Sequence, residues 1–367
     1  MSDNLLLPSY DGACITNLVP ALLDPADEAP SWLPAVAHDA ERVVLLVIDG
    51  LGWTQLAARP GLTPTLSAMQ GGPITTVAPS TTATALTSIT TGMPPGEHGV
   101  VGYRIAVEGE VLNVLRWSTP AGDARQTIPP AKVQPHPAFG GHRPPVLTRT
   151  EFEASGFTTA HLDGTRFTGY RTLGTLTAEL GRLARLGEPF VYAYYEGLDK
   201  VSHEYGLGIQ YDEELRWIDH LVSSVLDALP SGSVLVVTAD HGQVEVRDDA
   251  IVLPGDVLSH VAMQSGEGRF RWLHARAGRA GALKDAATDL LGHQAWVRTR
   301  DEAIAEGWYG PIVKDVAAGR LGDVLLAARG AVAFHDPQDT GPYLLVGRHG
   351  SLTEDEMLVP LLAAVAR

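Results

Sequence analysis

The chain has 367 residues, 45% of them hydrophobic, which is enough to bury a large core in one α/β domain or in a main domain with a smaller insertion. Its formal net charge of -16 argues against binding to nucleic-acid polymers or to anionic membranes, because both require basic patches. The single cysteine, Cys14, excludes an intramolecular disulfide and a cysteine-rich zinc cluster, so any metal would be held by Asp, His and hydroxyl oxygen.

Residues 1–40 are proline-rich and are predicted to be irregular. They contain no basic segment followed by an apolar run, and no window of the chain reaches transmembrane length. We therefore expect a cytoplasmic protein with no membrane segment, although the mature form of an exported protein would look the same. The sequence does not indicate an oligomeric state.

The first predicted strand covers residues 42–48 and ends in Asp49 and Gly50. Its continuous run of apolar, β-branched residues is typical of a strand buried on both faces of a parallel sheet. Open α/β sheets bind ligands at the carboxyl ends of their strands, which makes Asp49 a candidate ligand. A turn aspartate before a glycine is the simpler interpretation unless partners are found.

Residues 78–99 concentrate hydroxyl side chains where a helix is predicted to begin. Pro79 interrupts the β-like run before it, and the residues through Thr91 can form one helix that ends at Gly92. Thr82 then lies near a helix N-terminus, where free N–H groups and the helix dipole favour a phosphate. As a nucleophile it would need activation, and a metal ion is the natural candidate. Taken alone, the segment favours an ordinary N-cap.

The next part of the chain is predicted to contain a hairpin over 104–117 and then a long loop over 118–146, which would be functional or mobile. A helix is predicted over 147–155 and a strand over 157–162. Arg166 follows and could bind an anionic substrate, although a lone loop arginine is more often a solvated surface charge.

A helix over 174–186 and a strand over 190–195 precede Asp199 and His203. If these two residues start a helix, their spacing of four places both side chains on one face, where they could share a metal ion. A capping aspartate and a surface histidine are about equally consistent with the pair alone.

The helix predicted over 211–229 leads to a strand over 233–238, which ends in Asp240, His241 and Gly242. Adjacent side chains at a strand end point apart unless the chain turns, and the glycine permits that turn. The pair is a good candidate for metal binding and a poor feature for a core.

Residues 245–340 change to a mixture of short strands and helices, with a helix around 281–291. We interpret them as a smaller α+β insertion that could cap a site, with residues 1–244 and 341–367 forming the main domain. His349 lies in a glycine-flanked loop near the end of the chain and would be a surface residue if taken alone.

These signals become specific when they are combined. Successive parallel strands would bring the candidate ligands to one edge of the sheet, beside Thr82. Two metal ions need roughly seven ligands when each is near four-coordinate, with an open position left for substrate. The chain supplies that number only if His349 takes part.

In this order the motifs resemble the alkaline phosphatase superfamily, and most closely its nucleotide pyrophosphatase/phosphodiesterase branch with a threonine nucleophile. The match spans residues 42 to about 359. The resemblance implies an α/β fold with a mainly parallel central sheet sandwiched by helices. The motifs that carry it are Asp49-Gly50, Pro79 to Thr82, Asp199 to His203, Asp240-His241-Gly242 and His349-Gly350.

The resemblance also implies two Zn²⁺ ions, although Mn²⁺ or another divalent ion is possible. One ion would be held by Asp199, His203 and His349. The other would be held by Asp49, Asp240 and His241 together with Thr82.

The implied activity is hydrolysis of a phosphoric ester through a phosphothreonine at Thr82, with phosphodiesters or nucleotide pyrophosphates as the favoured small-molecule substrates. A phosphomonoesterase and a phosphonoacetate-type carbon–phosphorus hydrolase are alternatives within the same ligand set. A phosphosugar mutase fits less well because mutases normally have serine as the nucleophile. A non-catalytic binding protein of the same fold would have no reason to keep every ligand.

One position departs from the family pattern. The branch has an asparagine about twenty residues past the nucleophile that helps to bind a phosphoryl oxygen, and Tyr103 matches that position here. Arg104 beside it, or Arg166, could contact a dianionic phosphate and would then favour monoesters. Tyr194, Tyr195 or the insertion could instead form the apolar wall that a diester requires.

Overall fold

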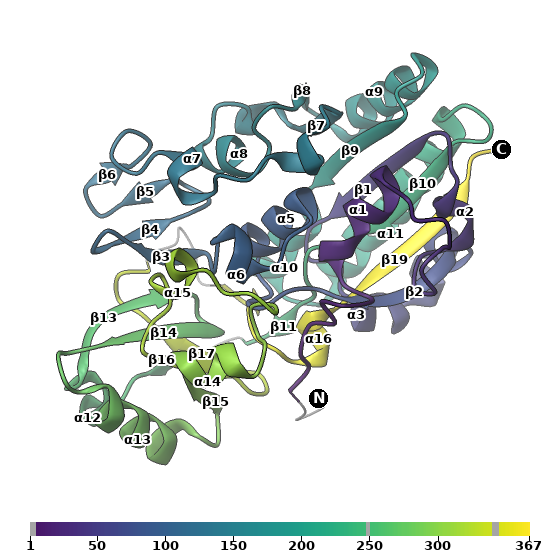
Figure 1. Cartoon of the computed structure of the whole chain (residues 1–367). Helices are drawn as coiled ribbons and strands as arrows, with labels where there is room; N and C mark the ends of the chain where they lie inside the picture. Colours follow the sequence, from purple (N-terminus) through teal and green to yellow (C-terminus); the bar gives the residue numbers. More distant parts are fainter. Residues whose placement is uncertain (1–4, 247–249, 340–344) are drawn as a thin grey trace.

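A central seven-stranded sheet organises the parts of the chain that this computed structural model describes, residues 5–246, 250–339 and 345–367. Its strand order is β2-β19-β10-β1-β9-β7-β8 (Figure 1). Only β19 runs against the other strands of this sheet, so the predicted mainly parallel α/β fold is confirmed. The strands are β1 Val43–Ile48, β2 Gln70–Thr75, β7 Pro145–Arg149, β8 Arg166–Tyr170, β9 Phe190–Tyr195, β10 Val234–Thr238 and β19 Leu358–Val365.

The middle of the sheet is apolar because its strands are buried on both faces. Every residue of β1 is buried, and the same holds for its neighbours β9 and β10. In the register of these strands, Val47 lies between Tyr194 and Thr238. The residues that follow the three strands therefore emerge at one edge of the sheet.

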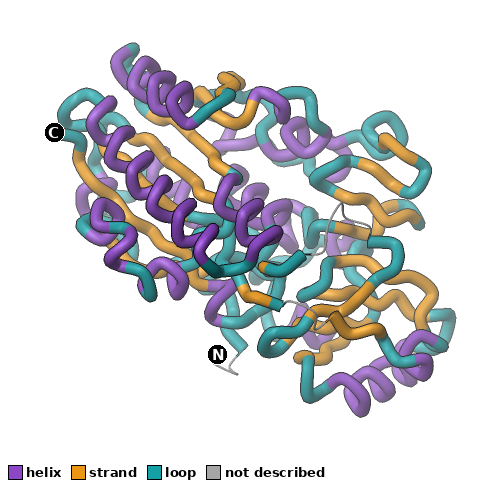
Figure 2. Tube along the Cα trace, turned by 180° about the vertical axis from the view of Figure 1, so that it is seen from behind, coloured by secondary structure: helices purple, strands orange, loops and turns teal. Residues whose placement is uncertain are grey.

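Helices cover both faces of the sheet, as predicted. One group contains α1, α5 and α8, and the other contains α9, α10 and α11, which Figure 2 shows from behind. The helices of the main part are α1 Leu18–Leu23, α2 Ala35–His38, α3 Trp53–Ala57, α4 Pro64–Ser67, α5 Thr82–Thr91, α6 Pro95–His98, α7 Pro130–Val133, α8 Gly156–His161, α9 Leu173–Arg185, α10 Gly197–Tyr205, α11 Ile209–Ala228 and α16 Glu354–Met357.

The segment around residue 150 differs from its prediction. The predicted helix over 147–155 is wrong, because β7 and a short 3-10 turn occupy these residues. The predicted strand over 157–162 is also wrong, because α8 forms there. Ser155 caps this helix by accepting a hydrogen bond from the Thr158 N–H, and the helix buries Phe157 and His161 four residues apart.

A smaller sheet follows α5. The predicted hairpin forms from β3 Arg104–Val107 and β4 Glu110–Asn113. The region predicted as a loop contains β5 Ser118–Thr119, β6 Gly122–Asp123 and α7, and the first two extend the hairpin into a four-stranded sheet.

Residues 261–328 build a separate antiparallel sheet in the order β13-β14-β16-β15, and α13 packs on it through Leu283, Ala287 and Leu291. The division into two domains stays a prediction, and its limit at 340/341 lies outside the described residues. The elements of this part and its flanks are β11 Val244–Glu245, β12 Ala250–Val252, α12 Gly255–Leu258, β13 Val261–Gly266, β14 Phe270–Ala275, α13 Ala280–Leu291, β15 Ala295–Thr299, α14 Arg300–Ala305, α15 Asp315–Ala318, β16 Val324–Ala328, β17 Ala333–His335 and β18 Gly347–Arg348.

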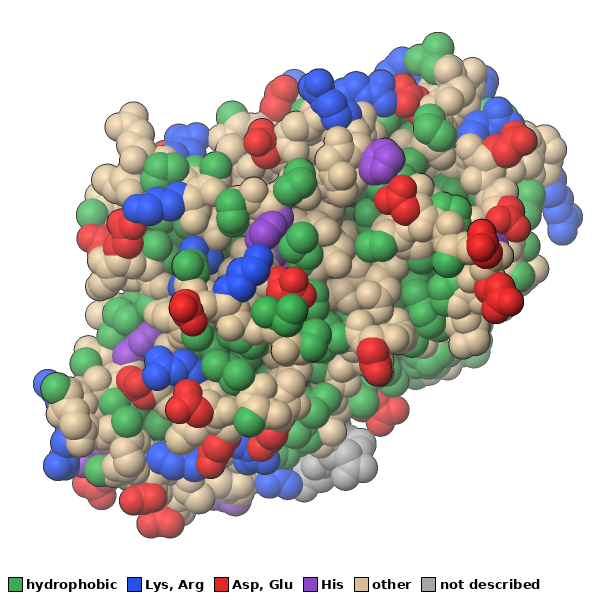
Figure 3. Space-filling model, in the orientation of Figure 1, with side chains coloured by type: hydrophobic (Ala, Val, Ile, Leu, Met, Phe, Trp, Pro, Cys, Tyr) green, Lys and Arg blue, Asp and Glu red, His purple; other side chains and the backbone are tan. Residues whose placement is uncertain are grey.

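The surface carries charged side chains of both signs, interspersed over the face that Figure 3 shows. Within the described ranges, none of the helices combines the length and the apolar character that crossing a bilayer demands.

Candidate active site

The carboxyl edge of the sheet gathers the predicted ligands. Asp49 directly follows β1, and Asp240 and His241 follow β10. Asp199 and His203 lie on α10, which begins two residues after β9. The parallel order β10-β1-β9 thus places three separate segments of the chain beside one another.

Thr82 is the first residue of α5 and is buried beside this group. Its Oγ1 lies 3.2 Å from Nε2 of His241. Thr81, the N-cap, has extended backbone angles and offers no side-chain cap to the helix. The first N–H groups of α5 are thus available to an anion at Thr82.

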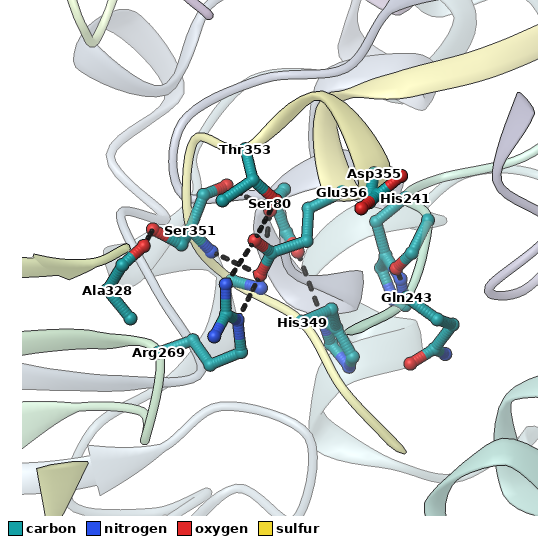
Figure 4. A network of polar contacts seen from close by, with 12 residues as sticks. Ser80, His241, Gln243, Arg269, Ala328, His349, Ser351, Thr353, Asp355 and Glu356 are labelled. Carbon is teal, nitrogen blue, oxygen red and sulfur yellow. Dashed lines mark hydrogen bonds and ion pairs between the residues drawn. The ribbon is translucent and has the colours of Figure 1, made fainter. Parts of the chain in front are cut away.

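The three histidines share one orientation. Each ring lies with Nδ1 within hydrogen-bond distance of a main-chain carbonyl oxygen, which makes Nδ1–H the donor and leaves the Nε2 lone pair free. The bonds are His203 to Gly347 at 2.7 Å, His241 to Gly242 at 3.0 Å, and His349 to Ser80 at 3.0 Å, the last drawn in Figure 4.

Each of these Nε2 atoms faces carboxylate oxygens. His241 Nε2 lies 3.2 Å from Asp49 Oδ1 and 3.4 Å from Asp240 Oδ2. Neither of these two oxygens has a hydrogen-bond partner within the described residues. Lone pairs and carboxylates at such distances repel one another unless a proton or a cation lies between them. The site therefore fits a cation.

The donor atoms form two overlapping groups that could each hold a metal ion. One group is Asp49, Asp240 and His241, and the other is Asp199, His241 and His349. His203 lies outside the second group but reaches Asp199, with 3.2 Å between Nε2 and Oδ2. Nitrogen and carboxylate oxygen donors of this kind suit Zn²⁺. All the predicted ligands are brought together, while their assignment to particular ions stays a prediction.

The acids of the site have strongly shifted pKa values. Burial, reinforced by the neighbouring Asp240 and Asp199, raises the pKa of Asp49 well above its usual value. Burial also raises the pKa of Asp240 to about 7. For Asp199, burial opposes ionisation, but His203, together with His349 and His241, outweighs it and lowers the pKa. Burial likewise disfavours a charged His203, yet Asp199 raises the pKa of that imidazole to about 9.

Two residues hold predicted ligands in place, and nothing in the sequence indicated this role. Gln243 donates from Nε2 to Asp199 Oδ1 at 2.5 Å, and the Tyr194 hydroxyl donates to Asp49.

The prediction that Tyr194 or Tyr195 could form an apolar wall for the substrate is wrong. The hydroxyl of Tyr195 is bonded to Glu214, and neither tyrosine lines the cleft.

A cleft of about 730 Å³ opens over the site. Thr82 and Tyr103 both line it, together with residues of the insertion such as Glu267 and Phe334. Glu267 was missed by the sequence reasoning. It is a buried acid whose pKa is raised by burial, and its Oε1 lacks a partner in the part of the chain that the structure describes.

The two predicted substrate arginines are not positioned as expected. Arg104 is buried, pairs with Asp336 at 2.5 Å and does not line the cleft. Arg166 begins β8 and forms two hydrogen bonds with Glu188. Because β8 runs parallel to β7 and β9, its first residue lies at the opposite edge of the sheet from the ligands.

A buried network connects the insertion to His349 (Figure 4). Arg269 binds both carboxylate oxygens of Glu356, at 2.6 and 2.7 Å. Glu356 accepts a hydrogen bond from the Ser351 N–H, and the Ser351 carbonyl accepts one from the Ser80 hydroxyl. Since the Ser80 carbonyl in turn orients His349, this network helps to fix a predicted ligand.

The Asp and His side chains and Thr82, at the carboxyl edge of a mainly parallel sheet, form a site typical of the alkaline phosphatase superfamily. The molecule is a hydrolase of phosphoric esters. The sequence pattern of the type I phosphodiesterase/nucleotide pyrophosphatase family matches residues 43–170 and 187–352. The chain belongs to this family. No curated protein sequence matches it.

Solved structures share the fold. Murine ectonucleotide pyrophosphatase/phosphodiesterase 5 is 15% identical, with a TM-score of 0.64 over 88% of this chain and 87% of that one. An inactive variant of the murine protein in complex with AMP is 13% identical, with a TM-score of 0.63 over the same shares. Phosphonoacetate hydrolase from Sinorhizobium meliloti 1021, in complex with phosphonoformate, is 20% identical, with a TM-score of 0.61 over 88% of this chain and 90% of that one.

Proposed function

We propose that the chain is a two-metal phosphodiesterase or nucleotide pyrophosphatase that forms a phosphothreonine intermediate on Thr82. The observation that carries this proposal is the placement of Thr82 Oγ1, 3.2 Å from His241, at a helix N-terminus beside acceptor atoms that fit a cation. Small phosphate esters or nucleotides are the proposed substrates, and the cytoplasm is the proposed location.

Two divalent ions, most simply Zn²⁺, fit the donor set. We assign Asp199, His203 and His349 to one ion, and Asp49, Asp240 and His241 with Thr82 to the other. Bound ions would lower the pKa of the Thr82 hydroxyl, supply a water-derived nucleophile and neutralise phosphoryl charge.

The chain's own groups then orient the reaction. Thr82 Oγ1 forms a bond to phosphorus while the bond from phosphorus to the leaving oxygen breaks. Water afterwards cleaves the phosphothreonine and restores the hydroxyl. The free N–H groups at the start of α5 hold the non-bridging oxygens throughout.

Arg104, Arg269 and Arg271 are paired with carboxylates, so these three give no preference for a dianionic monoester over a diester. A monoester carries close to two negative charges at neutral pH and profits from a free guanidinium near its third oxygen. Arg104 and Arg271 share Asp336, and both also lie within 4.0 Å of Asp339, while Arg269 is bound to Glu356. These guanidiniums are therefore already neutralised.

A phosphonate that carries a carboxylate is the second candidate substrate. Arg116 and Arg348 line the cleft, and neither has a carboxylate within 4.0 Å in the described ranges of the chain. Either could take a second anionic group, whether a carboxylate or the second phosphate of a pyrophosphate.

A substrate panel tests this proposal. The zinc-loaded protein should hydrolyse bis-p-nitrophenyl phosphate or a dinucleotide pyrophosphate faster than p-nitrophenyl phosphate or phosphonoacetate. A clear preference for the monoester or for phosphonoacetate would contradict it.

The nucleophile is tested by Thr82→Ala, which should lower the rate at least about a thousandfold while the protein keeps about two metal ions. Thr90→Ala is the matched control, because Thr90 lies on the same helix and bonds only to carbonyls of α5. An unchanged rate in Thr82→Ala would mean that the nucleophile is another residue.

A further inference from the structure

The amide of Asn113 has a defined orientation at the end of β4. Its Oδ1 accepts a hydrogen bond from the Arg116 N–H at 3.0 Å. A backbone N–H can only donate, so the other end of the amide must be the NH₂ group. This Nδ2 donates to the Tyr103 hydroxyl oxygen at 2.6 Å.

The hydroxyl of Tyr103 therefore accepts from Asn113 and keeps its own hydrogen for another partner. No acceptor for that hydrogen is found within residues 5–246, 250–339 and 345–367. Burial, together with the charge of Asp339, raises the pKa of Tyr103, so the hydroxyl stays protonated at neutral pH. Tyr103 lines the same cleft as Thr82, so its free hydrogen is available to a substrate there.

The main chain holds this pair in place. The Val114 N–H donates to the Tyr103 carbonyl at 2.9 Å. Residues 113 and 114 therefore form hydrogen bonds with both the side chain and the backbone of Tyr103. Phosphoryl oxygens only accept hydrogen bonds, and a neutral phenol that donates without adding charge suits a monoanionic diester.

We propose that Asn113 is a positioning residue, which keeps the Tyr103 O–H group as a hydrogen-bond donor toward the phosphoryl group of the substrate. This inference rests on the proposed function. It adds a residue outside the predicted site and explains how a tyrosine can donate a hydrogen bond to the phosphoryl group in this chain.

The test is a reversal of the hydrogen bond. In Asn113→Asp the new carboxylate can still accept from the Arg116 N–H, but toward Tyr103 it can only accept. It would take the hydroxyl hydrogen and leave the cleft without this donor. We expect kcat/KM for the diester to fall about 10- to 100-fold, as in Tyr103→Phe, which removes only the hydroxyl. Tyr205→Phe, an exposed tyrosine outside the cleft, is the control.

Two readouts separate positioning from a merely structural role. The double variant Asn113→Asp, Tyr103→Phe should be no slower than Tyr103→Phe alone, because both changes remove the same hydrogen bond. The activity of Asn113→Asp relative to wild type should also recover as the pH falls to about 4, where the new carboxyl gains a proton and can donate again.

Several results would overturn the inference. An unchanged rate in Asn113→Asp would overturn it, and so would a further large loss of rate in the double variant. Both results leave the proposed function standing as long as hydrolysis still depends on Thr82. If Thr82→Ala is fully active, the proposed function fails and this inference fails with it. Melting temperatures and zinc content of both single variants should match wild type, and a variant that lost zinc would refute a role limited to positioning Tyr103.

Discussion

Gln243 shows how a neutral side chain can organise a charged site. Its amide donates to Asp199 Oδ1 from beneath the turn at Gly50, where an added Cβ would lie 2.6 Å from the Gln243 amide nitrogen. The hydrogen bond holds Oδ1 of Asp199, which lies 3.8 Å from Nε2 of His349, and leaves the other oxygen, Oδ2, facing His203. Outer groups of this kind commonly set the affinity of a metal site.

We predict that Gln243→Leu, which keeps the size of the side chain but removes the donor, weakens zinc binding about 10- to 100-fold. Titration of the metal-free protein against a competing chelator measures this change. Gln210→Leu, on an exposed residue of α11, should leave the affinity unchanged. An affinity of Gln243→Leu within twofold of wild type would show that Asp199 needs no such support.

At the scale of elements, the turn after β10 is enclosed by backbone from two other segments. The Gly242 N–H donates to the Glu356 carbonyl at 2.9 Å. A Cβ at Gly242 would meet the Asp355 carbonyl oxygen at 2.0 Å and the Gly52 Cα at 3.0 Å. Backbone atoms cannot move aside like a flexible side chain, so the glycine permits α16 and the turn after β1 to pack on the ligand loop.

Gly242→Ala should therefore destabilise the protein by about 2 to 3 kcal/mol and reduce its zinc content. Urea unfolding measures the first effect and elemental analysis the second. Gly255→Ala is the control, since no atom lies within 4 Å of an added Cβ there. Equal stability of the two variants would mean that α16 can shift without disturbing the loop.

At the scale of the whole molecule, stability depends on how the buried charges are compensated. Without metal, burial first and neighbouring acids second raise the pKa of Asp49, and burial raises that of Asp240 to about 7. Asp199 overcomes burial to raise the pKa of His203 to about 9. A pKa that is higher in the folded state stabilises the fold below the unfolded value, and this contribution is lost as the pH rises through the folded value.

The metal-free protein should therefore lose about 2 kcal/mol of stability between pH 7 and pH 9. Histidines with lowered pKa values, such as His349, make the fold more stable as the pH rises. This contribution is nearly complete once the pH exceeds their unfolded pKa of about 6.5, so it changes little between pH 7 and pH 9. Bound zinc replaces the protons, so the loaded protein should change much less. Urea unfolding at both pH values, with and without chelator, measures the difference. Equal or greater stability of the stripped protein at pH 9 would contradict it.

The elements that could be predicted are those whose signal is local and long. The strands β1, β9 and β10 and the helix α11 have apolar patterns that admit one secondary structure. The stretch from 145 to 162 was assigned the wrong way round, because a short apolar run fits a strand or a helix equally well. There the packing of β7 between β8 and β9 decided the outcome.

The sequence alone determined that Asp and His residues follow the central strands and are candidate ligands. A buried strand must end in a turn, and an Asp or His without a neutralising partner has few structural uses there. Only the tertiary structure decided which charges remain available to a substrate. Arg104 meets Asp336 across 232 residues of sequence, and Asn113 turns the Tyr103 hydroxyl into a donor. Ion pairs and hydrogen bonds depend on distance in space, and no spacing along the chain encodes that distance.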